Sequence, residues 1–181
     1  MVTTRLLTAE DFALIETDEP WELWEGEVRR VPGVGLAASE IAGVMFVRVF
    51  GFVRPRGLGV VTVADGAFIL GRDPDVVVMP DVAYISWDRL PGRVRPSGYS
   101  PVPPNLAVEV ESPTDRPGQI AQKMRLYRDA GVPLVWWVHP RDHTVSVYRN
   151  GELAATLGED DLLDGEDVLP GFVLPVRDIF L

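Results

Sequence analysis

Residues 105–113, NLAVEVESP, form the stretch that decides how the rest of the chain is read. Residues 106–110 are apolar except for Glu109, which predicts a strand buried in the interior. An unpaired ionised carboxylate in such a place costs several kcal/mol unless a cation compensates it. Glu109 therefore either faces water or is compensated by a positively charged group. Glu111 follows two residues later and is expected on the same side of the strand.

Length and composition limit the class of protein. The 181 residues, 46% of them hydrophobic, suit a single domain spanning 1–181 with a sizeable core. The N-terminus has no signal-peptide core, and no apolar run approaches the roughly 18 residues of a membrane span. Cysteine is absent, so disulfides and thiolate metal sites are excluded. We expect a cytoplasmic protein with no membrane association.

The chain is acidic overall, and nearly all of its positive side chains are arginines. A net charge of -10 disfavours broad, non-specific binding of nucleic acid, although a local basic groove remains compatible with it. The chain has 16 arginines and one lysine, Lys123. Lysine supplies a compact point charge that arginine does not, so this position draws attention.

The order of expected elements predicts an α/β or α+β domain around a mixed sheet. A short helix capped by Thr8 and a hairpin turning at Glu25-Gly26 form an N-terminal part, about 8–31. Residues 36–54 form an apolar helix that is either central or faces a second copy. Asp65-Gly66 predicts a hairpin within 59–70. Strands over 76–78, 82–85 and 106–110 lead to a helix over 115–131, and a strand and turn extension spans about 143–181.

Acidic residues and the lysine converge near the central strands. Asp81 interrupts an apolar strand directly after Pro80, and Glu109 lies on the second strand. Lys123 lies on the helix that leaves this second strand, so it can fold back over the strand end. Two carboxylates beside a cation suit Mg²⁺. The alternatives are that Asp81 caps a turn, that Glu109 pairs with an arginine, and that Lys123 is solvated.

Four stretches, MPDVAYIS, NLAVEVESPTDR, KMRLYRDAGVPLVWWVHP and LLDGEDVLPGF, resemble the signatures of a bacterial family of restriction-endonuclease-like proteins. That family belongs to the PD-(D/E)XK nuclease superfamily, and the resemblance runs from WELWEGEV to PVRDIF. It implies a restriction-endonuclease-like core, a mixed β-sheet flanked by helices.

The resemblance also implies roles for individual residues. Asp81 and Glu109 match the pair that holds a divalent metal, Mg²⁺ or Mn²⁺. Lys123 matches a superfamily lysine displaced onto the following helix, where it orients or deprotonates the attacking water and offsets phosphate charge. An upstream acid often completes such a site; Glu27 is the first choice and Glu25 the second, although both also suit a solvated hairpin.

The chain departs from the family pattern at several positions, of which only the missing helix histidine bears on catalytic competence. Glu111 is a further acidic residue beside the metal pair, more typical of a rim than of a ligand. The helix over 36–54 carries Ala38 where relatives have a histidine. His139 and His143 are expected at the surface of a hairpin turn rather than as metal ligands.

The function that these residues favour is metal-dependent hydrolysis of phosphodiester bonds in DNA. Contacts to DNA phosphates are expected from Arg93, Arg95, Arg116 and Arg125, although solvated loop arginines would give the same pattern. A catalytically silent protein that binds nucleic acid or a protein is the alternative. In either case we expect a homodimer, with the helix over 36–54 as its interface.

Overall fold

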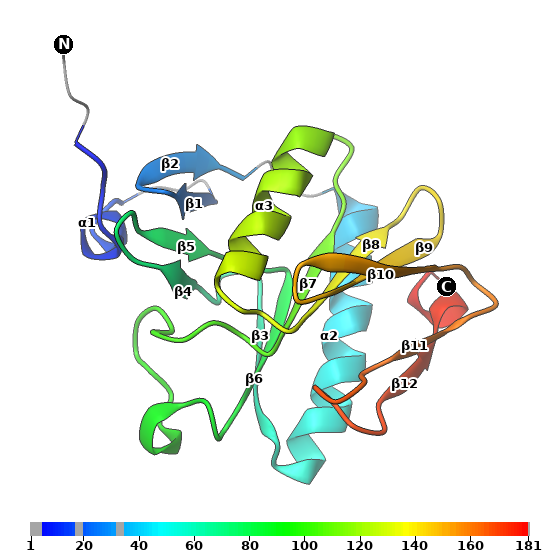
Figure 1. The fold of residues 1–181 in the computed structure, drawn as a ribbon. Coiled ribbons are helices and arrows are strands. Elements are labelled where there is room, and N and C mark those ends of the chain that lie inside the picture. The colour runs from blue at the N-terminus through cyan, green and yellow to red at the C-terminus, as the bar shows by residue number, and fades with distance from the viewer. Residues whose placement is uncertain (1–4, 17–19, 32–34, 181) are drawn as a thin grey trace.

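The computed structural model describes residues 5–16, 20–31 and 35–180, and two sheets dominate it (Figure 1). The larger sheet has six strands in the order β10-β9-β8-β7-β6-β3. Its central neighbours β7 and β8 run parallel, and the other pairs run antiparallel. The sheet is therefore mixed, as predicted. Its strands are β3 (Gly59–Val63), β6 (Val82–Ser86), β7 (Leu106–Val110), β8 (Leu134–His139), β9 (Thr144–Arg149) and β10 (Glu152–Leu157).

One helix covers each face of the six-stranded sheet. Because side chains alternate along a strand, Leu106, Val108 and Val110 of β7 pack in the core beneath α2 (Leu36–Arg56). Ala107 points to the opposite face, where α3 (Pro117–Asp129) packs through Met124 and Tyr127. Glu109 shares the face of Ala107. The alternation thus directs the buried glutamate toward α3.

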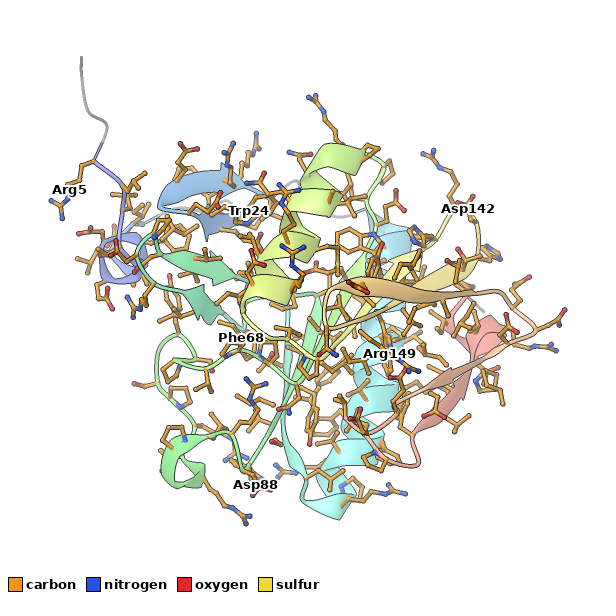
Figure 2. All side chains as sticks on the ribbon, viewed as in Figure 1. Arg5, Trp24, Phe68, Asp88, Asp142 and Arg149 are labelled. Atoms are coloured by element: carbon orange, nitrogen blue, oxygen red, sulfur yellow. The ribbon has the colours of Figure 1, made fainter. Side chains whose placement is uncertain are left out.

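The second sheet is antiparallel, with the strand order β2-β1-β5-β4. Its strands are β1 (Trp21–Trp24), β2 (Glu27–Arg30), β4 (Phe68–Gly71) and β5 (Val76–Val78). Trp24 and Phe68 of this sheet join the core beneath α3, and Figure 2 shows the Trp24 side chain beside that helix. The β1–β2 hairpin therefore forms a wall opposite α3.

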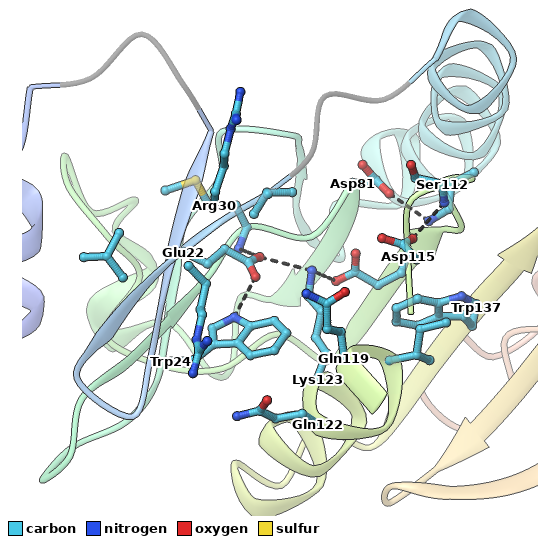
Figure 3. A pocket seen from close by; sticks show the side chains of 17 residues that line it. Glu22, Trp24, Arg30, Asp81, Ser112, Asp115, Gln119, Gln122, Lys123 and Trp137 are labelled. Carbon is cyan, nitrogen blue, oxygen red and sulfur yellow. Dashed lines mark hydrogen bonds and ion pairs between the residues drawn. The ribbon is translucent and has the colours of Figure 1, made fainter. Parts of the chain in front are cut away.

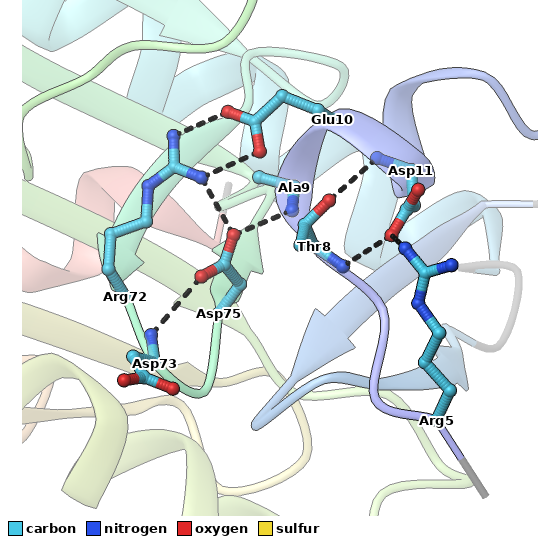
Figure 4. Close-up of polar contacts among 8 residues, drawn as sticks. All are labelled: Arg5, Thr8, Ala9, Glu10, Asp11, Arg72, Asp73 and Asp75. Atoms are coloured by element: carbon cyan, nitrogen blue, oxygen red, sulfur yellow. Dashed lines mark hydrogen bonds and ion pairs between the residues drawn. The ribbon is translucent and has the colours of Figure 1, made fainter.

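The short N-terminal helix α1 (Ala9–Ala13) is held to the second sheet by polar contacts (Figure 4). The predicted cap is confirmed, since Thr8 and Asp11 form a reciprocal capping box. Asp75 accepts a hydrogen bond of 2.7 Å from the Ala9 N–H, and Arg72 pairs with both Asp75 and Glu10. Phe12 packs on the far side of this sheet with Leu23 and Val77.

The hairpin predicted within 59–70 is wrong. β3 pairs with β6 of the larger sheet, whereas β4 pairs with β5 of the smaller one. The Asp65-Gly66 turn does form, with the Gly66 N–H donating to the Val63 carbonyl. However, the Ala64 N–H donates to the Asp81 carbonyl, so β3 remains with β6 while the chain crosses to the other sheet. A local turn signal carries no information about which sheet each arm joins.

The helix α2 is apolar but only one of its faces is covered. Contrary to the expectation that no apolar run approaches the length of a membrane span, α2 is long and apolar enough to cross a membrane. An 18-residue window of this helix has a mean hydropathy of 1.7, and 28% of the window is buried. Core helices of soluble proteins pass the same test, and five α2 residues lie in the core: Ala38, Ile41, Met45, Val49 and Val53. The C-terminal part adds β11 (Leu162–Asp164), β12 (Val173–Pro175) and the 3-10 turn η2 (Val176–Ile179), and another such turn, η1 (Pro91–Arg93), precedes β7.

Candidate active site

A pocket of about 380 Å³ lies where the two sheets meet beneath α3 (Figure 3). The β1–β2 hairpin forms one wall, α3 forms the other, and the end of β7 forms the floor. Acidic side chains from four segments line it together with the single lysine of the chain: Glu22, Asp81, Glu109, Asp115 and Lys123. The pocket gathers residues that are up to 101 positions apart in sequence, from Glu22 to Lys123.

Strand register brings Asp81 and Glu109 together. β6 pairs antiparallel to β7 with Val82 opposite Val108, so Asp81, at the start of β6, comes opposite Glu109. The Asp81 carboxylate accepts a hydrogen bond of 2.7 Å from the Val110 N–H. Asp81 follows Pro80 at the point where the chain leaves β5 and enters the larger sheet. The structure therefore brings together the two carboxylates that were predicted to hold a metal.

Lys123 lies where the sequence predicted it, folded back over the strand end. Its Nζ atom is 2.8 Å from Glu109 Oε1 and 3.1 Å from Glu22 Oε1, and all three residues are buried. Tyr127 follows Lys123 by one helical turn and donates its hydroxyl to the same oxygen of Glu109. The alternative of a solvated lysine is excluded, and the cation that pairs with Glu109 is Lys123 rather than an arginine.

Glu22 was missed by the sequence analysis and takes the place expected for Glu27. Glu22 is 1% exposed, and its carboxylate accepts hydrogen bonds of 2.8 Å from Trp24 Nε1 and from the Met79 N–H. Glu27 is exposed and pairs with Arg29 at 2.8 Å. The reason is strand position, since β1 lies between β2 and β5 whereas β2 is the edge strand. The signal was present in WELW, a glutamate set among apolar residues like Glu109 in LAVEV.

Glu25 and Glu111 also lie outside the cluster. Glu25 occupies the exposed hairpin turn with a φ of 54° and accepts a long hydrogen bond of 3.5 Å from Gln122. β7 ends at Val110, so the alternation that predicted Glu111 beside Glu109 does not continue. Glu111 instead lies 2.5 Å from His139 Nδ1. The prediction of Glu111 as an additional acid of the metal pair is therefore not supported by its position.

His139 and His143 make polar contacts of their own. The other ring nitrogen of His139 lies 2.9 Å from the Ser146 hydroxyl, so His139 is half-buried at the end of β8 rather than on a free turn. His143 is exposed, as predicted, and pairs with Glu159. Neither histidine lines the pocket.

The arginines predicted to contact DNA do not line the pocket. Arg93 pairs with Asp88 at 2.9 Å, and the Arg95 guanidinium lies 4.7 Å from the centre of the Trp87 ring. Arg116 precedes α3, and Arg125 lines a separate shallow cleft on the outer side of that helix. Arg29 and Arg30 of β2 line the pocket instead. The positions of these arginines in the sequence gave no information on which surface they would occupy.

Asp115 is a further acidic residue that was not singled out from the sequence. It lies in the turn between β7 and α3 and accepts a hydrogen bond of 2.8 Å from the Ser112 N–H. Figure 3 shows it on the Asp81 side of the pocket, opposite Glu22. Asp115 therefore adds a fourth carboxyl group to the pocket wall.

The electrostatics of the pocket reflect a shortage of positive charge. Burial raises the pKa of Glu109 to about 8, since the nearby Lys123 charge opposes this shift only in part and Asp81 and Glu22 reinforce it. Burial also raises the pKa of Asp81, against the hydrogen bond from Val110. Burial alone would lower the pKa of Lys123, but Glu109 and Glu22 outweigh it and raise that pKa. Lys123 is thus held as an ammonium.

The donor atoms suit a hard divalent cation. Asp81 and Glu109 present carboxylate oxygens at neighbouring strand ends, and Mg²⁺ commonly binds through one or two protein carboxylates with water completing its shell. The raised pKa values mark carboxyl groups that a further cation would stabilise in the ionised form. Within residues 5–16, 20–31 and 35–180, no group of three or more His, Asp and Glu side chains has metal-ligand geometry. The pocket therefore suits a cation that is held by two protein carboxylates.

Comparison with protein families identifies the family of this chain. The model of the Uma2 family, described as "Putative restriction endonuclease", matches residues 9–177. The chain belongs to the Uma2 family. The resemblance drawn from the sequence motifs is thereby confirmed. A comparison with curated proteins gives no match.

A solved structure agrees on the fold of this Uma2 protein. It is described as "a putative nuclease belonging to DUF820" from Anabaena variabilis, with 21% identity and a TM-score of 0.82. The match covers 96% of this chain and 97% of that chain. At this identity the likeness shows a shared nuclease-like fold, which confirms the predicted restriction-endonuclease-like core of a mixed sheet flanked by helices.

Proposed function

We propose that this Uma2 protein is a metal-dependent endonuclease that hydrolyses phosphodiester bonds in DNA. The observation that carries the proposal is the convergence of Asp81, Glu109 and Lys123 in one pocket, with the lysine ammonium 2.8 Å from the glutamate. Such a set combines hard oxygen donors with a fixed positive charge. Both are needed where a nucleophile approaches an anionic phosphate.

Two carboxylates would hold the cofactor. Asp81 and Glu109 are the residues that would bind Mg²⁺ or Mn²⁺, and Val110 orients Asp81 through its N–H. A bound ion of this kind supplies Lewis-acid stabilisation of phosphate charge and lowers the pKa of a coordinated water. The need to neutralise Glu109, whose pKa is raised to about 8, supports this assignment.

Lys123 acts in this proposal as a fixed cation rather than as a base. Its raised pKa keeps a proton on Nζ, so this atom can donate to a phosphate oxygen or to the attacking water but does not abstract a proton. Glu22 has a positioning role, because its Oε1 atom lies 3.1 Å from Nζ and is itself fixed by the Met79 N–H. Removing Glu22 would take away one of the two contacts that fix Lys123 without removing any proposed metal ligand.

DNA would enter between the β1–β2 hairpin and α3. Arg29 and Arg30 lie on the hairpin side of the pocket and are the phosphate contacts we propose in place of Arg93, Arg95, Arg116 and Arg125. With a net charge of -10, binding has to depend on such local contacts. A cytoplasmic location, where DNA is accessible, completes the proposal and agrees with the lack of cysteine.

One observation favours a second candidate, a catalytically silent binding protein. Lys123 already contacts both Glu109 and Glu22, and the described residues offer no three-ligand metal cluster. A protein in which the ion pair is purely structural would give the same contacts. The two candidates differ in their response to metal.

The test is cleavage of supercoiled plasmid and of single-stranded DNA with Mg²⁺ or Mn²⁺. We expect the wild type to cleave, Asp81→Asn, Glu109→Gln and Lys123→Met to lose activity, and Glu22→Gln to lose part of it. Glu152→Gln is the control, since Glu152 is exposed on β10 and does not line the pocket. Equal cleavage by all variants would indicate a contaminant. Absence of cleavage and of any stabilisation by Mn²⁺ would favour the silent protein.

A further inference from the structure

The second face of α2 is apolar and exposed, opposite the face that packs in the core. Val47 is 65% exposed and Phe50 is 39% exposed, and the Phe46 ring lies 5.2 Å from that of Phe50. Exposed Gly43 and Gly51 flank Val47, with nothing within 4 Å of a side chain placed on them. At 100° per residue, Gly43, Val47, Phe50 and Gly51 form one stripe on the side of α2 away from Met45 and Val49. A contiguous apolar surface of this kind marks an interaction site.

The charges at the ends of the stripe are arranged symmetrically. Glu40 lies seven residues before Val47, and Arg54 lies seven residues after it, which corresponds to about 10.5 Å on each side. Both are exposed, and among the described residues neither side chain has an ion pair. By contrast, Arg48 pairs with Asp178, and Arg56 lies over the Phe52 ring. Glu40 and Arg54 are thus available to a partner.

We propose that α2 pairs with α2 of a second copy, antiparallel, about a two-fold axis at Val47. In such an isologous contact, each residue lies opposite the partner residue that is equally far from Val47 in the other direction. Glu40 therefore meets the partner's Arg54, and Gly43 meets the partner's Gly51. Glycine at these positions permits close approach of the two helices. The charge pattern selects a second copy of this chain over other occupants, because one helix carries both halves of the pairing. This inference is independent of the proposed nuclease function.

Helix dimensions agree with direct contact at the axis. Packed helices lie about 8–10 Å apart, and Cα atoms lie about 2.3 Å from each helix axis. Facing Cα atoms at Val47 would therefore be about 3.4–5.4 Å apart, which overlaps the range of about 4.4–6.8 Å that a disulfide spans. Because the chain has no cysteine, single introduced cysteines report on this contact without competing thiols.

The first experiment is oxidation of cysteine variants. Val47→Cys should form a covalent dimer alone. Gly43→Cys and Gly51→Cys should each form little dimer alone but should cross-link efficiently when mixed, because they face each other across the axis. Leu153→Cys is the control, since Leu153 is 57% exposed on β10. Equal cross-linking of Leu153→Cys and Val47→Cys, or no gain on mixing the glycine variants, would overturn the proposed register.

The second experiment measures mass by sedimentation over a range of concentrations. The wild type should change from 20.0 kDa toward twice that mass, and Glu40→Arg or Arg54→Glu should raise the dimer Kd at least about tenfold. The double variant Glu40→Arg/Arg54→Glu should recover dimerisation, which a misfolded variant would not do. A wild type that is monomeric throughout overturns the proposal. Vesicle binding by that monomer, lost in Val47→Glu, would assign the face to lipid instead.

Discussion

The Nζ atom of Lys123 lies 2.8 Å from Oε1 of Glu109, although the two residues belong to a helix and to a strand on different sides of a turn. This contact explains how a carboxylate is accommodated within the apolar strand LAVEV. The same ammonium is 3.1 Å from Glu22, so one buried cation forms ion pairs with two buried carboxylates. Tyr127 completes the surroundings of Glu109 by donating its hydroxyl. The stability of the junction between the two sheets therefore depends on the charges that we assign to the active site.

Lys123→Met tests that dependence. The variant leaves Glu22 and Glu109 without their common cation, and breaking a buried pair by removing one partner costs about 3–5 kcal/mol. We expect a loss of that size in the free energy of unfolding, measured by urea denaturation with tryptophan fluorescence. Arg125→Met, an exposed position on the same helix, should stay within about 0.5 kcal/mol of the wild type. Equal losses in both variants would contradict the assignment of Lys123.

Comparing Glu22→Gln with Glu27→Gln tests whether a glutamate on the inner strand of the hairpin contributes more to stability than one on the edge strand. A glutamine keeps the shape but removes a charge that contacts Lys123, and we expect a loss of about 1–3 kcal/mol in stability. Glu27→Gln, on the edge strand, should change stability by less than about 0.5 kcal/mol. The two variants are compared in the same urea titration. A larger effect at Glu27 would mean that β2, not β1, is the inner strand of the hairpin.

Metal binding gives a test that does not need a substrate. If Asp81 and Glu109 bind Mn²⁺, the ion stabilises the folded state by about 2.7 kcal/mol at a concentration of 100 Kd. We expect a rise in Tm with Mn²⁺ for the wild type and none for Asp81→Asn. Glu111→Gln should keep the full rise, because Glu111 contacts His139 outside the pocket. A rise that is retained by Asp81→Asn but lost by Glu111→Gln would move the metal site to the His139 side of the sheet.

The sequence predicted those parts of the fold and site that depend on short-range patterns. Periodicity predicted β7 and both long helices, and the apolar surroundings of Glu109 identified a buried charge before its partner was known. The resemblance pointed to Glu25 and Glu27 and not to Glu22, and a hairpin sequence alone does not reveal which arm will be the inner strand. That distinction depends on pairing between β1 and β5, across more than 50 residues. The hairpin predicted within 59–70 was wrong for a similar reason, since β3 and β4 find their partners in different sheets.

The attachment of α1 predicts a response to acid that is separate from the active site. Burial alone would raise the pKa of Asp75, but the N–H groups of Ala9 and Asp73 and the Arg72 guanidinium outweigh it and lower that pKa below 3.8. The unfolded chain therefore binds a proton on Asp75 near pH 3.8 while the folded chain does not. The stabilising contribution of Asp75 is complete above this pH and is lost as the pH falls through the lower, folded pKa.

Asp75→Asn should remove this contribution. The free energy of unfolding should then fall less steeply as the pH is lowered. We expect the variant to be less stable than the wild type at pH 6, and the difference between them to shrink below pH 4. Stability is measured by urea denaturation at a series of pH values, with α1 followed by hydrogen exchange at the Ala9 amide, which donates to Asp75. Asp142→Asn, at an exposed turn, serves as the control with a wild-type profile. A difference that stays constant from pH 6 to pH 3 would show that the Asp75 charge contributes nothing beyond its shape, and that packing of Phe12 alone holds the helix to the sheet.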